Sequence, residues 1–568
     1  MEIDLEKRKC KIQKRDDLLE NLGGSGLAAA LYREYGLLGE DPFAPGQPLI
    51  LAIGPLTGLF PLMSKAVLGF KSPYTGHYAE THAGGRLALA LRYAGLDAVV
   101  IRGRASHPVY LVIGEKEFSC KDALHLWGMD VVTCARVIRN SEPVGKGRRS
   151  ILRIGPAGEN LVKFACINVD TFRHFGRLGA GALMGSKKLK ALVVIGEASY
   201  SINSPPYKKY YREIYRRFTA SEAMKKYHNL GTPVNVLALN VLKSLPTRNL
   251  TSTSFEEAEK ISGEYFAEKL LLRQVACSGC PIGCIHIGLL REKFGPEHEY
   301  FYKQVSYDYE PIFALGSMLG VAPGEKLISL LEQAERYGLD AISSGVALAW
   351  ATEAFQRGLI GQKETLLPLK FGDVSCYYQA LVHLSRRTND FYRLLGEGTL
   401  RAAGRFGGSE FACVLGQEMA GYATGPVFFV SQALGFRHSH LDTAGYQLDQ
   451  EKNLPALKQA LDYLVEEEKR RFILTSMVAC LFARNIYTPE TIAESLVAAG
   501  MPELAENLEK RAAVLCGERW KLKKATGFDP FQVTIPRRFY EVETLQGPVS
   551  GKFMDELFKA YAAYLADL

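Results

Sequence analysis

The sequence has no run of the roughly 18 uncharged apolar residues that a membrane-spanning helix needs. Residues 1–15, MEIDLEKRKCKIQKR, are charged where a secretory signal peptide would be apolar. There is also no strong excess of one charge, because 69 basic and 61 acidic residues leave a net charge of only +8. We therefore expect a cytoplasmic protein with no membrane span and no nucleic-acid partner.

Cysteine is sparse, with 11 residues among 568, and the number is odd. Cytoplasmic chains rarely form disulfides, and an odd number argues against a fully paired set. Clustered cysteines are therefore expected to bind metal, and isolated ones to be small core residues. The chain is too long for one hydrophobic core, so we expect about two to four domains.

Composition divides the chain into a β-rich part and a helical part. Strands are predicted at 49–53, 98–101, 109–113 and 191–195. After a composition break at 199–206, helices are predicted at 207–218, 326–337, 344–357, 454–471 and 489–499. The predicted fold class is α+β, with a β-rich N-terminal domain (1–200) and two mainly α-helical domains (207–410 and 411–568). The basic, aromatic helix at 207–218 could dock a redox partner, but an amphipathic helix with a solvated face is favoured.

The most specific motif is Cys277-Ser-Gly-Cys280-Pro-Ile-Gly-Cys284, on a turn rich in glycine and proline. Three thiolates at this spacing can bind one iron–sulfur cluster, with a fourth ligand from elsewhere. Zinc is the alternative, although it often takes two C-x2-C pairs and the sequence has no second pair. We favour the cluster over zinc. Three unligated core cysteines are the least favoured interpretation, because so tight a spacing is hard to explain by packing.

Glycine-rich segments recur in the N-terminal third, including His82-Ala-Gly-Gly85 and Gly176-Arg-Leu-Gly-Ala-Gly181. Glycine lets the backbone approach a ligand and present N–H groups to it, which suits phosphate. Taken singly, each segment is more typical of a tight turn, and none matches a Walker A or Rossmann pattern.

In this order, the glycine segments and the cysteine motif resemble the tungsten-dependent aldehyde:ferredoxin oxidoreductase family. Further matching segments are Leu245-Pro-Thr-Arg-Asn249, Ile261-Ser-Gly-Glu264, Tyr309-Glu-Pro311 and Gly338-Leu-Asp340. The resemblance runs from about residue 20 to about residue 345 and is looser in the final third. It implies a β-rich base for two pterins, covered by two helical domains.

The resemblance also implies cofactors. These are a tungsten or molybdenum bis-pterin held through dithiolene sulfurs, a [4Fe–4S] cluster, and magnesium as a candidate bridge between pterin phosphates. Cys480 is the implied fourth cluster ligand, after Cys277, Cys280 and Cys284. The residues expected at the pterins are Lys65, Gly84, Gly85, Arg177, Gly179, Gly181, Glu335, Asp340 and Thr475.

Several of these positions depart from the family pattern. The family presents motifs of the form D-x-x-G-L-(D/C) to its pterins, and here the first begins with Glu335. The second, Thr475-Ser-Met-Val-Ala-Cys480, keeps only the cysteine, and a hydroxyl is a weaker acceptor than a carboxylate. Lys65 stands where the family has an arginine bridging pterin and cluster, and lysine lacks the planar fork. The chain is therefore expected to be a divergent member.

Glu310 is the predicted proton-transfer residue, because the family has a glutamate close to the metal in this segment. Its apolar neighbours predict a raised pKa, which would suit a proton acceptor near neutral pH. The alternative is a carboxylate that stabilises the first turn of a helix.

The family also places a histidine near the metal, in the region Arg437-His438-Ser-His440. His440 aligns best and His438 is the alternative. Such side chains can orient a carbonyl or an anionic substrate. A polar surface loop is the interpretation without catalysis.

The leading functional hypothesis is oxidation of a small aldehyde to a carboxylate, with electrons passing through the cluster to ferredoxin or an iron–sulfur subunit. One alternative is the tungsten-containing subunit of a reductase complex that acts on an aromatic thioester or another activated acid. The other is an electron-relay subunit without turnover. A homodimer and a hetero-oligomer are both open.

Overall fold

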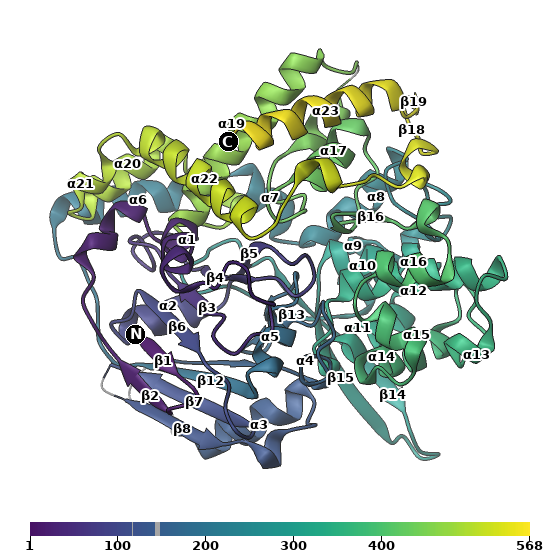
Figure 1. The fold of residues 1–568 in the computed structure, drawn as a ribbon, viewed down its shortest axis with the longest axis horizontal. Coiled ribbons are helices and arrows are strands. Elements are labelled where there is room, and N and C mark those ends of the chain that lie inside the picture. Colours follow the sequence, from purple (N-terminus) through teal and green to yellow (C-terminus); the bar gives the residue numbers. More distant parts are fainter. Residues whose placement is uncertain (116, 143–147, 452) are drawn as a thin grey trace.

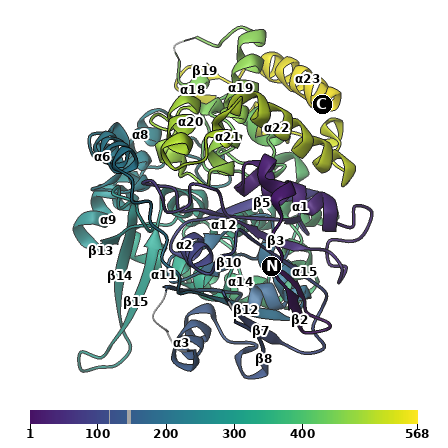
Figure 2. The ribbon, with the colours of Figure 1, turned by 90° about the vertical axis from the view of Figure 1, so that its left-hand side faces the viewer.

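Strands are concentrated before residue 197 and helices after it in the computed structural model, which describes residues 1–115, 117–142, 148–451 and 453–568 (Figure 1). This is the α+β organisation expected from the sequence. Figure 2 shows the C-terminal helices as a layer over the N-terminal sheets. No helix in the described residues is both long and apolar enough to cross a membrane.

Two six-stranded sheets form the N-terminal part. The first contains, in spatial order, β2 (Lys9–Lys11), β1 (Glu2–Asp4), β6 (Ala98–Arg102), β3 (Leu49–Ala52), β4 (Ala66–Lys71) and β5 (Tyr78–Ala83). The second contains β11 (Arg173–Phe175), β10 (Ile167–Val169), β9 (Arg148–Arg153), β12 (Leu189–Gly196), β7 (Val109–Gly114) and β8 (Phe118–Asp122). Neighbouring strands are antiparallel except the pairs β1–β6 and β7–β12.

The two sheets pack face to face because side chains alternate along each strand. Leu49 and Leu51 of β3 share one buried apolar core with Leu192 and Val194 of β12. Ile50, on the opposite face of β3, belongs to a larger core shared with the helices. The first sheet is therefore covered on both faces, with the helical parts on the side where α1 (Gly24–Tyr35) lies.

The middle part combines helices with a three-stranded sheet. Its main helices are α10 (Tyr309–Leu315), α11 (Gly324–Tyr337), α12 (Ala341–Gln356), α14 (Val374–Arg386), α15 (Asp390–Leu395) and α16 (Thr399–Phe406). The sheet contains β13 (Leu271–Val275), β14 (Ile285–Lys293) and β15 (Tyr300–Tyr307). Beyond β13, the β14–β15 ribbon projects from the body of the molecule (Figures 1 and 2).

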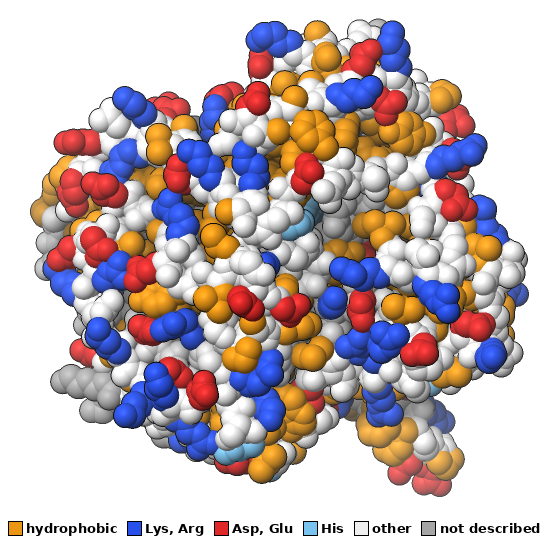
Figure 3. All heavy atoms as spheres, in the orientation of Figure 1, with side chains coloured by type: hydrophobic (Ala, Val, Ile, Leu, Met, Phe, Trp, Pro, Cys, Tyr) orange, Lys and Arg blue, Asp and Glu red, His pale blue; other side chains and the backbone are white. Residues whose placement is uncertain are grey.

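The C-terminal part is mainly helical. Its helices include α17 (Pro426–Leu434), α18 (Gly445–Asp449), α19 (Leu457–Ser476), α20 (Pro489–Ala498), α22 (Leu508–Ala525) and α23 (Gly551–Asp567). Helix α1 packs on α19 and α22, so the first and last parts of the chain share a core. Basic and acidic side chains are intermixed over the face in Figure 3, as the small net charge leads one to expect.

The predicted elements all correspond to observed ones. The predicted strands are β3, β6, β7 and β12, and the predicted helices are α6 (Pro205–Thr219), α11, α12, α19 and α20. Helix α6 buries Ile214 and Phe218 and packs on α20, while its basic side chains stay largely exposed. The favoured interpretation of α6 as an amphipathic helix is therefore confirmed.

Candidate active site

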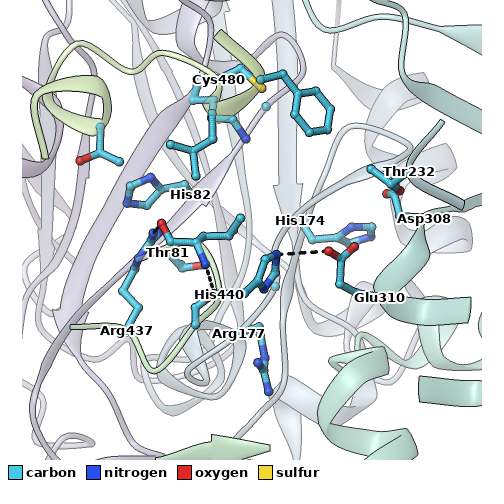
Figure 4. Close-up of a pocket in the computed structure, with 18 of the residues that line it drawn as sticks. Thr81, His82, His174, Arg177, Thr232, Asp308, Glu310, Arg437, His440 and Cys480 are labelled. Carbon is cyan, nitrogen blue, oxygen red and sulfur yellow. Dashed lines mark hydrogen bonds and ion pairs between the residues drawn. The ribbon is translucent and has the colours of Figure 1, made fainter. Parts of the chain in front are cut away.

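A cavity of about 430 Å³ lies where the sheets meet both helical parts, and Figure 4 shows it in close-up. The N-terminal part contributes residues within 62–65, 80–84 and 173–178. The middle part contributes the cysteine motif and the start of α10, and the C-terminal part contributes residues within 417–446 and 471–484. Regions far apart in the sequence therefore form one site.

The four predicted cluster cysteines line this one cavity. Leu62 connects their two segments, because its N–H donates to Gly279 O at 3.3 Å and its carbonyl accepts from Cys480 N–H at 3.0 Å. Burial, followed by the nearby Cys480, raises the pKa of the Cys280 thiol to about 12. Within the described residues, no three His, Cys, Asp or Glu side chains converge closely enough to hold one metal ion.

Two glycines hold the cysteine loop in place. Gly85 O accepts from Ser278 N–H at 3.0 Å, and Gly85 has a φ of +98°, which favours glycine. A β-carbon on Gly84 would lie 2.7 Å from Cys277 Sγ, so a larger residue would displace the thiol. Of this pair, only Gly84 lines the cavity.

Gly179 and Gly181, which were expected at the pterins, are not among the residues that line the cavity. A β-carbon on Gly179 would collide with Lys163 O, and one on Gly181 with Cys166 O. Their lack of a side chain lets α5 (Ala180–Ser186) pack closely against neighbouring backbone. Close packing of backbone therefore accounts for glycine at these two positions, and their expected place at the pterins stays a prediction.

Arg177 does line the cavity, and α12 positions it. Its Nε donates to Asp340 Oδ2 at 3.1 Å and its Nη2 donates to Glu418 O at 2.8 Å. Asp340 also caps α12 by accepting from Ile342 N–H at 3.0 Å, and it lies behind Arg177 rather than in the wall. Arg177 Nη1 is buried with no partner among the described residues, so it can donate to an anion.

Glu335, expected at a pterin, reaches the cavity only through His174, which the sequence analysis missed. Glu335 Oε2 lies 2.6 Å from His174 Nε2, and Glu335 Oε1 accepts from Asn168 Nδ2 at 2.9 Å. Burial acts to raise the pKa of Glu335, but the His174 charge and hydrogen bond outweigh it, and the pKa lies below its ordinary value. Glu335 therefore orients a cavity histidine.

Glu310 lies in the first turn of α10 and faces His440 in the cavity (Figure 4). The distance from His440 Nε2 to Glu310 Oε1 is 3.2 Å, and the Tyr422 hydroxyl donates to the same oxygen at 3.0 Å. His440 Nδ1 is buried without a partner in the described part of the chain. Glu310 is thus a first-turn carboxylate, as one interpretation held, and it is also paired with a histidine.

The predicted rise in the pKa of Glu310 is wrong. Burial acts in that direction, but the hydrogen bond and charge of His440 and the hydrogen bond of Tyr422 outweigh it, so the pKa lies below its ordinary value. The sequence showed only the apolar neighbours of Glu310. Its polar partners lie 112 and 130 residues further along the chain, where no local pattern reveals them.

His438 does not line the cavity, which removes it as the alternative to His440. Its Nδ1 lies 2.8 Å from Ala433 O and its Nε2 lies 3.3 Å from Lys523 Nζ. Burial, and then the charge of Lys523, hold the pKa of His438 well below its ordinary value. His438 is therefore a neutral core histidine.

Lys65 and Thr475, which depart from the family pattern, both line the cavity. The Thr475 hydroxyl donates to Phe472 O at 3.1 Å, one turn back along α19. The Lys65 backbone N–H donates to Val478 O at 3.1 Å. In the described residues the Lys65 ammonium has no carboxylate within 4.0 Å, so its charge faces the cavity uncompensated.

His82 is a second cavity residue whose side chain the sequence analysis overlooked, because its segment was noted for glycines. Burial lowers the pKa of His82 to about 4, so the ring is neutral at pH 7. Its Nε2 is buried and has no hydrogen-bond partner among the described residues, with Glu80 Oε2 at 3.6 Å. The donors of Lys65, His82 and Arg177 fit anionic groups such as pterin phosphates, and the four thiols fit a cluster.

Two family models match almost the whole chain. Residues 1–196 match "Aldehyde ferredoxin oxidoreductase, N-terminal domain", and residues 209–566 match "Aldehyde ferredoxin oxidoreductase, domains 2 & 3". The chain belongs to the aldehyde ferredoxin oxidoreductase family. This family binds a tungsten bis-pterin cofactor and a [4Fe–4S] cluster, which decides between iron–sulfur and zinc.

The relatives of this chain align with most of its length. The tungsten-containing aldehyde ferredoxin oxidoreductase of Pyrococcus abyssi is 33% identical over 576 residues, covering 95% of this chain and 91% of the relative. The aliphatic sulfonate oxidoreductase, WOR-like subunit, of Pyrococcus furiosus is 30% identical over 71% of this chain and 66% of the relative. These identities fit the expected divergent member.

A solved structure shares the fold of this family member. The active site complex BamBC of benzoyl coenzyme A reductase, in complex with 1,5-dienoyl-CoA, superposes with a TM-score of 0.84. The match covers 100% of this chain and 93% of that chain at 20% sequence identity. At this identity the likeness establishes the fold.

Proposed function

We propose that the chain oxidises an aldehyde to a carboxylic acid and passes the electrons through the cluster to ferredoxin or another iron–sulfur protein. The observation that supports this best is the contact of 3.2 Å between Glu310 and His440, in the cavity that the four cysteines also line. Aldehyde and water give a carboxylic acid, two protons and two electrons, so the site needs a proton acceptor beside a redox centre.

Each cofactor has residues suited to hold it. Lys65, Arg177 and His82 would bind the pterin phosphates, and the assignment of the cluster ligands is Cys277, Cys280, Cys284 and Cys480. When bound, the tungsten centre accepts an electron pair and the cluster relays electrons singly.

Glu310 and His440 divide the proton transfer between them. His440 and Tyr422 both contact Glu310 Oε1, and no side chain of the described residues donates to Oε2. Oε2 is therefore the oxygen that takes a proton from water as it adds to the carbonyl carbon. His440 orients Glu310 through Nε2, and its unpartnered Nδ1 is available to the substrate or a water.

A second candidate is reduction of an aromatic thioester within a larger complex. The fold likeness to the benzoyl coenzyme A reductase complex supports it, as do the departures at Lys65 and Thr475. Two results together would favour this candidate. The purified protein would contain tungsten but oxidise no aldehyde, and it would oxidise a reduced dye when a benzoyl thioester is supplied as the electron acceptor. Protein that binds neither tungsten nor molybdenum would favour an electron-relay subunit.

The substitution Glu310→Gln tests the first proposal. A neutral amide cannot take the proton, so aldehyde-dependent dye reduction by the purified holoenzyme should fall at least about 100-fold. Iron and tungsten contents should remain at wild-type levels. Near wild-type turnover in this variant would reject the role of Glu310, and loss of metal would identify a structural carboxylate instead.

Glu325→Gln is the matched control. Glu325 also lies in the first turn of a helix, α11, and accepts from a tyrosine hydroxyl, that of Tyr265, at 3.0 Å, but it is outside the cavity wall. It should keep wild-type activity. Cys480→Ala serves as the opposite control, because it should lower the iron content.

A further inference from the structure

Aromatic side chains gather in the cavity wall beside Glu310. The rings of Tyr227 and Phe482 stack with centroids 4.3 Å apart and planes 11° from parallel. The rings of Tyr422 and Tyr446 stack with centroids 5.7 Å apart and planes 21° from parallel. All four rings line the cavity, and proton transfer uses only the hydroxyl of Tyr422.

The Tyr422–Tyr446 pair starts at the reacting groups, and the Tyr227–Phe482 pair lines the same cavity. The Tyr422 hydroxyl donates to Glu310 Oε1 at 3.0 Å, and the ring centroids of Tyr422 and His440 are 4.9 Å apart. Tyr446 follows, and all four aromatic residues pack against the large core on one side while remaining partly exposed. Partly exposed aromatic faces favour a flat apolar ligand, because such a ligand displaces water from them.

Arg484 lies two residues after Phe482 and also lines the cavity. Its Nη1 donates to Leu481 O at 3.2 Å, and in the described residues no carboxylate lies within 4.0 Å of its guanidinium. The other arginines in this region of the wall are neutralised. Arg437 contacts Asp442 at 2.7 Å, and Arg471 contacts Glu467 at 3.0 Å. An unneutralised, half-buried guanidinium favours an anionic group of the ligand.

We propose that the substrate is an aromatic aldehyde that carries a carboxylate on the ring, away from the formyl group. The ring lies against the stacked tyrosines and Phe482, the formyl group meets Glu310 and His440, and Arg484 binds the carboxylate. This inference rests on the proposed aldehyde oxidation. The oxygen of a water molecule forms the new C–O bond, and the aldehyde C–H bond and one O–H bond of the water break. Two protons and two electrons leave, and the electrons go to the iron–sulfur acceptor.

The test compares 4-formylbenzoate with benzaldehyde as substrates of the holoenzyme. Wild type should show the higher kcat/KM for 4-formylbenzoate. In Arg484→Gln the ratio of the two kcat/KM values should fall about tenfold, chiefly because the carboxylated aldehyde binds more weakly and its KM rises. Arg470→Gln, at an exposed arginine of α19 outside the cavity, should leave the ratio unchanged. An unchanged ratio in Arg484→Gln would overturn the proposal.

Binding of terephthalate, the expected dicarboxylate product, separates this proposal from the function on which it rests. Calorimetric titration should show a Kd about tenfold weaker in Arg484→Gln than in wild type. If no aldehyde is oxidised but binding depends on Arg484, the proposed function fails and the anion subsite stands. If aldehydes are oxidised but both proteins bind terephthalate equally, the subsite fails and the function stands.

Discussion

At the scale of single residues, the partners of Glu310 decide its protonation. The apolar sequence around it favours the neutral acid, yet His440 and Tyr422 lower the pKa and keep the carboxylate ionised. A proton acceptor must be ionised to act, so Glu310 is ready across the neutral range. The proposed oxidation should therefore lose activity in acid, as the pH falls through the lowered pKa of Glu310.

Tyr422→Phe tests this electrostatic balance. Loss of the hydrogen bond at 3.0 Å removes one cause of the lowered pKa, so the pKa of Glu310 should rise. In wild type the acidic limb of kcat/KM should lie below about pH 4.5, and in the variant it should move to higher pH. An acidic limb at the same pH in both proteins would show that another group controls it.

Sequence alone identified much of the site but not its pairings. The cysteine motif, Arg177, Glu310 and His440 were predicted because each carries a local pattern or a family match, and all of them line the cavity. His174 and Tyr422 were missed, because their roles depend on partners 161 and 112 residues away. Glycine patterns were the hardest to interpret, since close packing of backbone explains Gly179 and Gly181 and the sequence does not distinguish packing from contact with a ligand.

At the scale of elements, α12 both packs the middle part and positions a cavity arginine. Helical periodicity predicted α12 because it depends on local spacing, as it did for α19 and α20. Asp340, the residue directly before α12, has two roles that periodicity does not reveal. Asp340 caps the helix through Ile342 N–H and holds Arg177 Nε at 3.1 Å, so one carboxylate links a helix end to the site.

Asp340→Asn and Asp340→Ala separate these two tasks. Asparagine keeps the helix cap, whereas alanine loses it, so alanine should lower the free energy of unfolding by about 1 kcal/mol more than asparagine. Both variants lose the charge that orients Arg177 and should bind less tungsten. The measurements are urea titration and metal content. Equal tungsten content in wild type and Asp340→Asn would contradict the orienting role.

At the scale of the whole molecule, buried charges join the first sheet to the C-terminal helices. Arg519 of α22 contacts Glu80 of β5 at 3.4 Å and Glu468 of α19 at 3.1 Å. All three side chains are almost fully buried. Glu80 also lines the cavity, so the contacts that hold these parts of the chain together extend to the site.

Arg519→Met should be strongly destabilising, since it leaves two buried carboxylates without a cation. We expect the free energy of unfolding to fall by about 3–5 kcal/mol. Arg33→Met is the matched control, because Arg33 of α1 contacts Glu518 of α22 at 2.9 Å in an exposed pair. That change should cost less than about 1 kcal/mol. Urea titrations that give equal losses would contradict the distinction between the buried and exposed pairs.

The cavity draws its wall from residues between positions 62 and 484, and this has a consequence for biosynthesis. Cys284 and Cys480 are 196 residues apart (480 minus 284). At the usual 5–20 residues per second, a ribosome needs about 10–40 s to make that stretch. During this interval Cys277, Cys280 and Cys284 have been synthesised but Cys480 has not. Arg177 likewise lacks the C-terminal residues that complete the cavity wall. If Cys480 is the fourth ligand, as proposed, we expect stable loading of the cluster only after residue 480 has been translated.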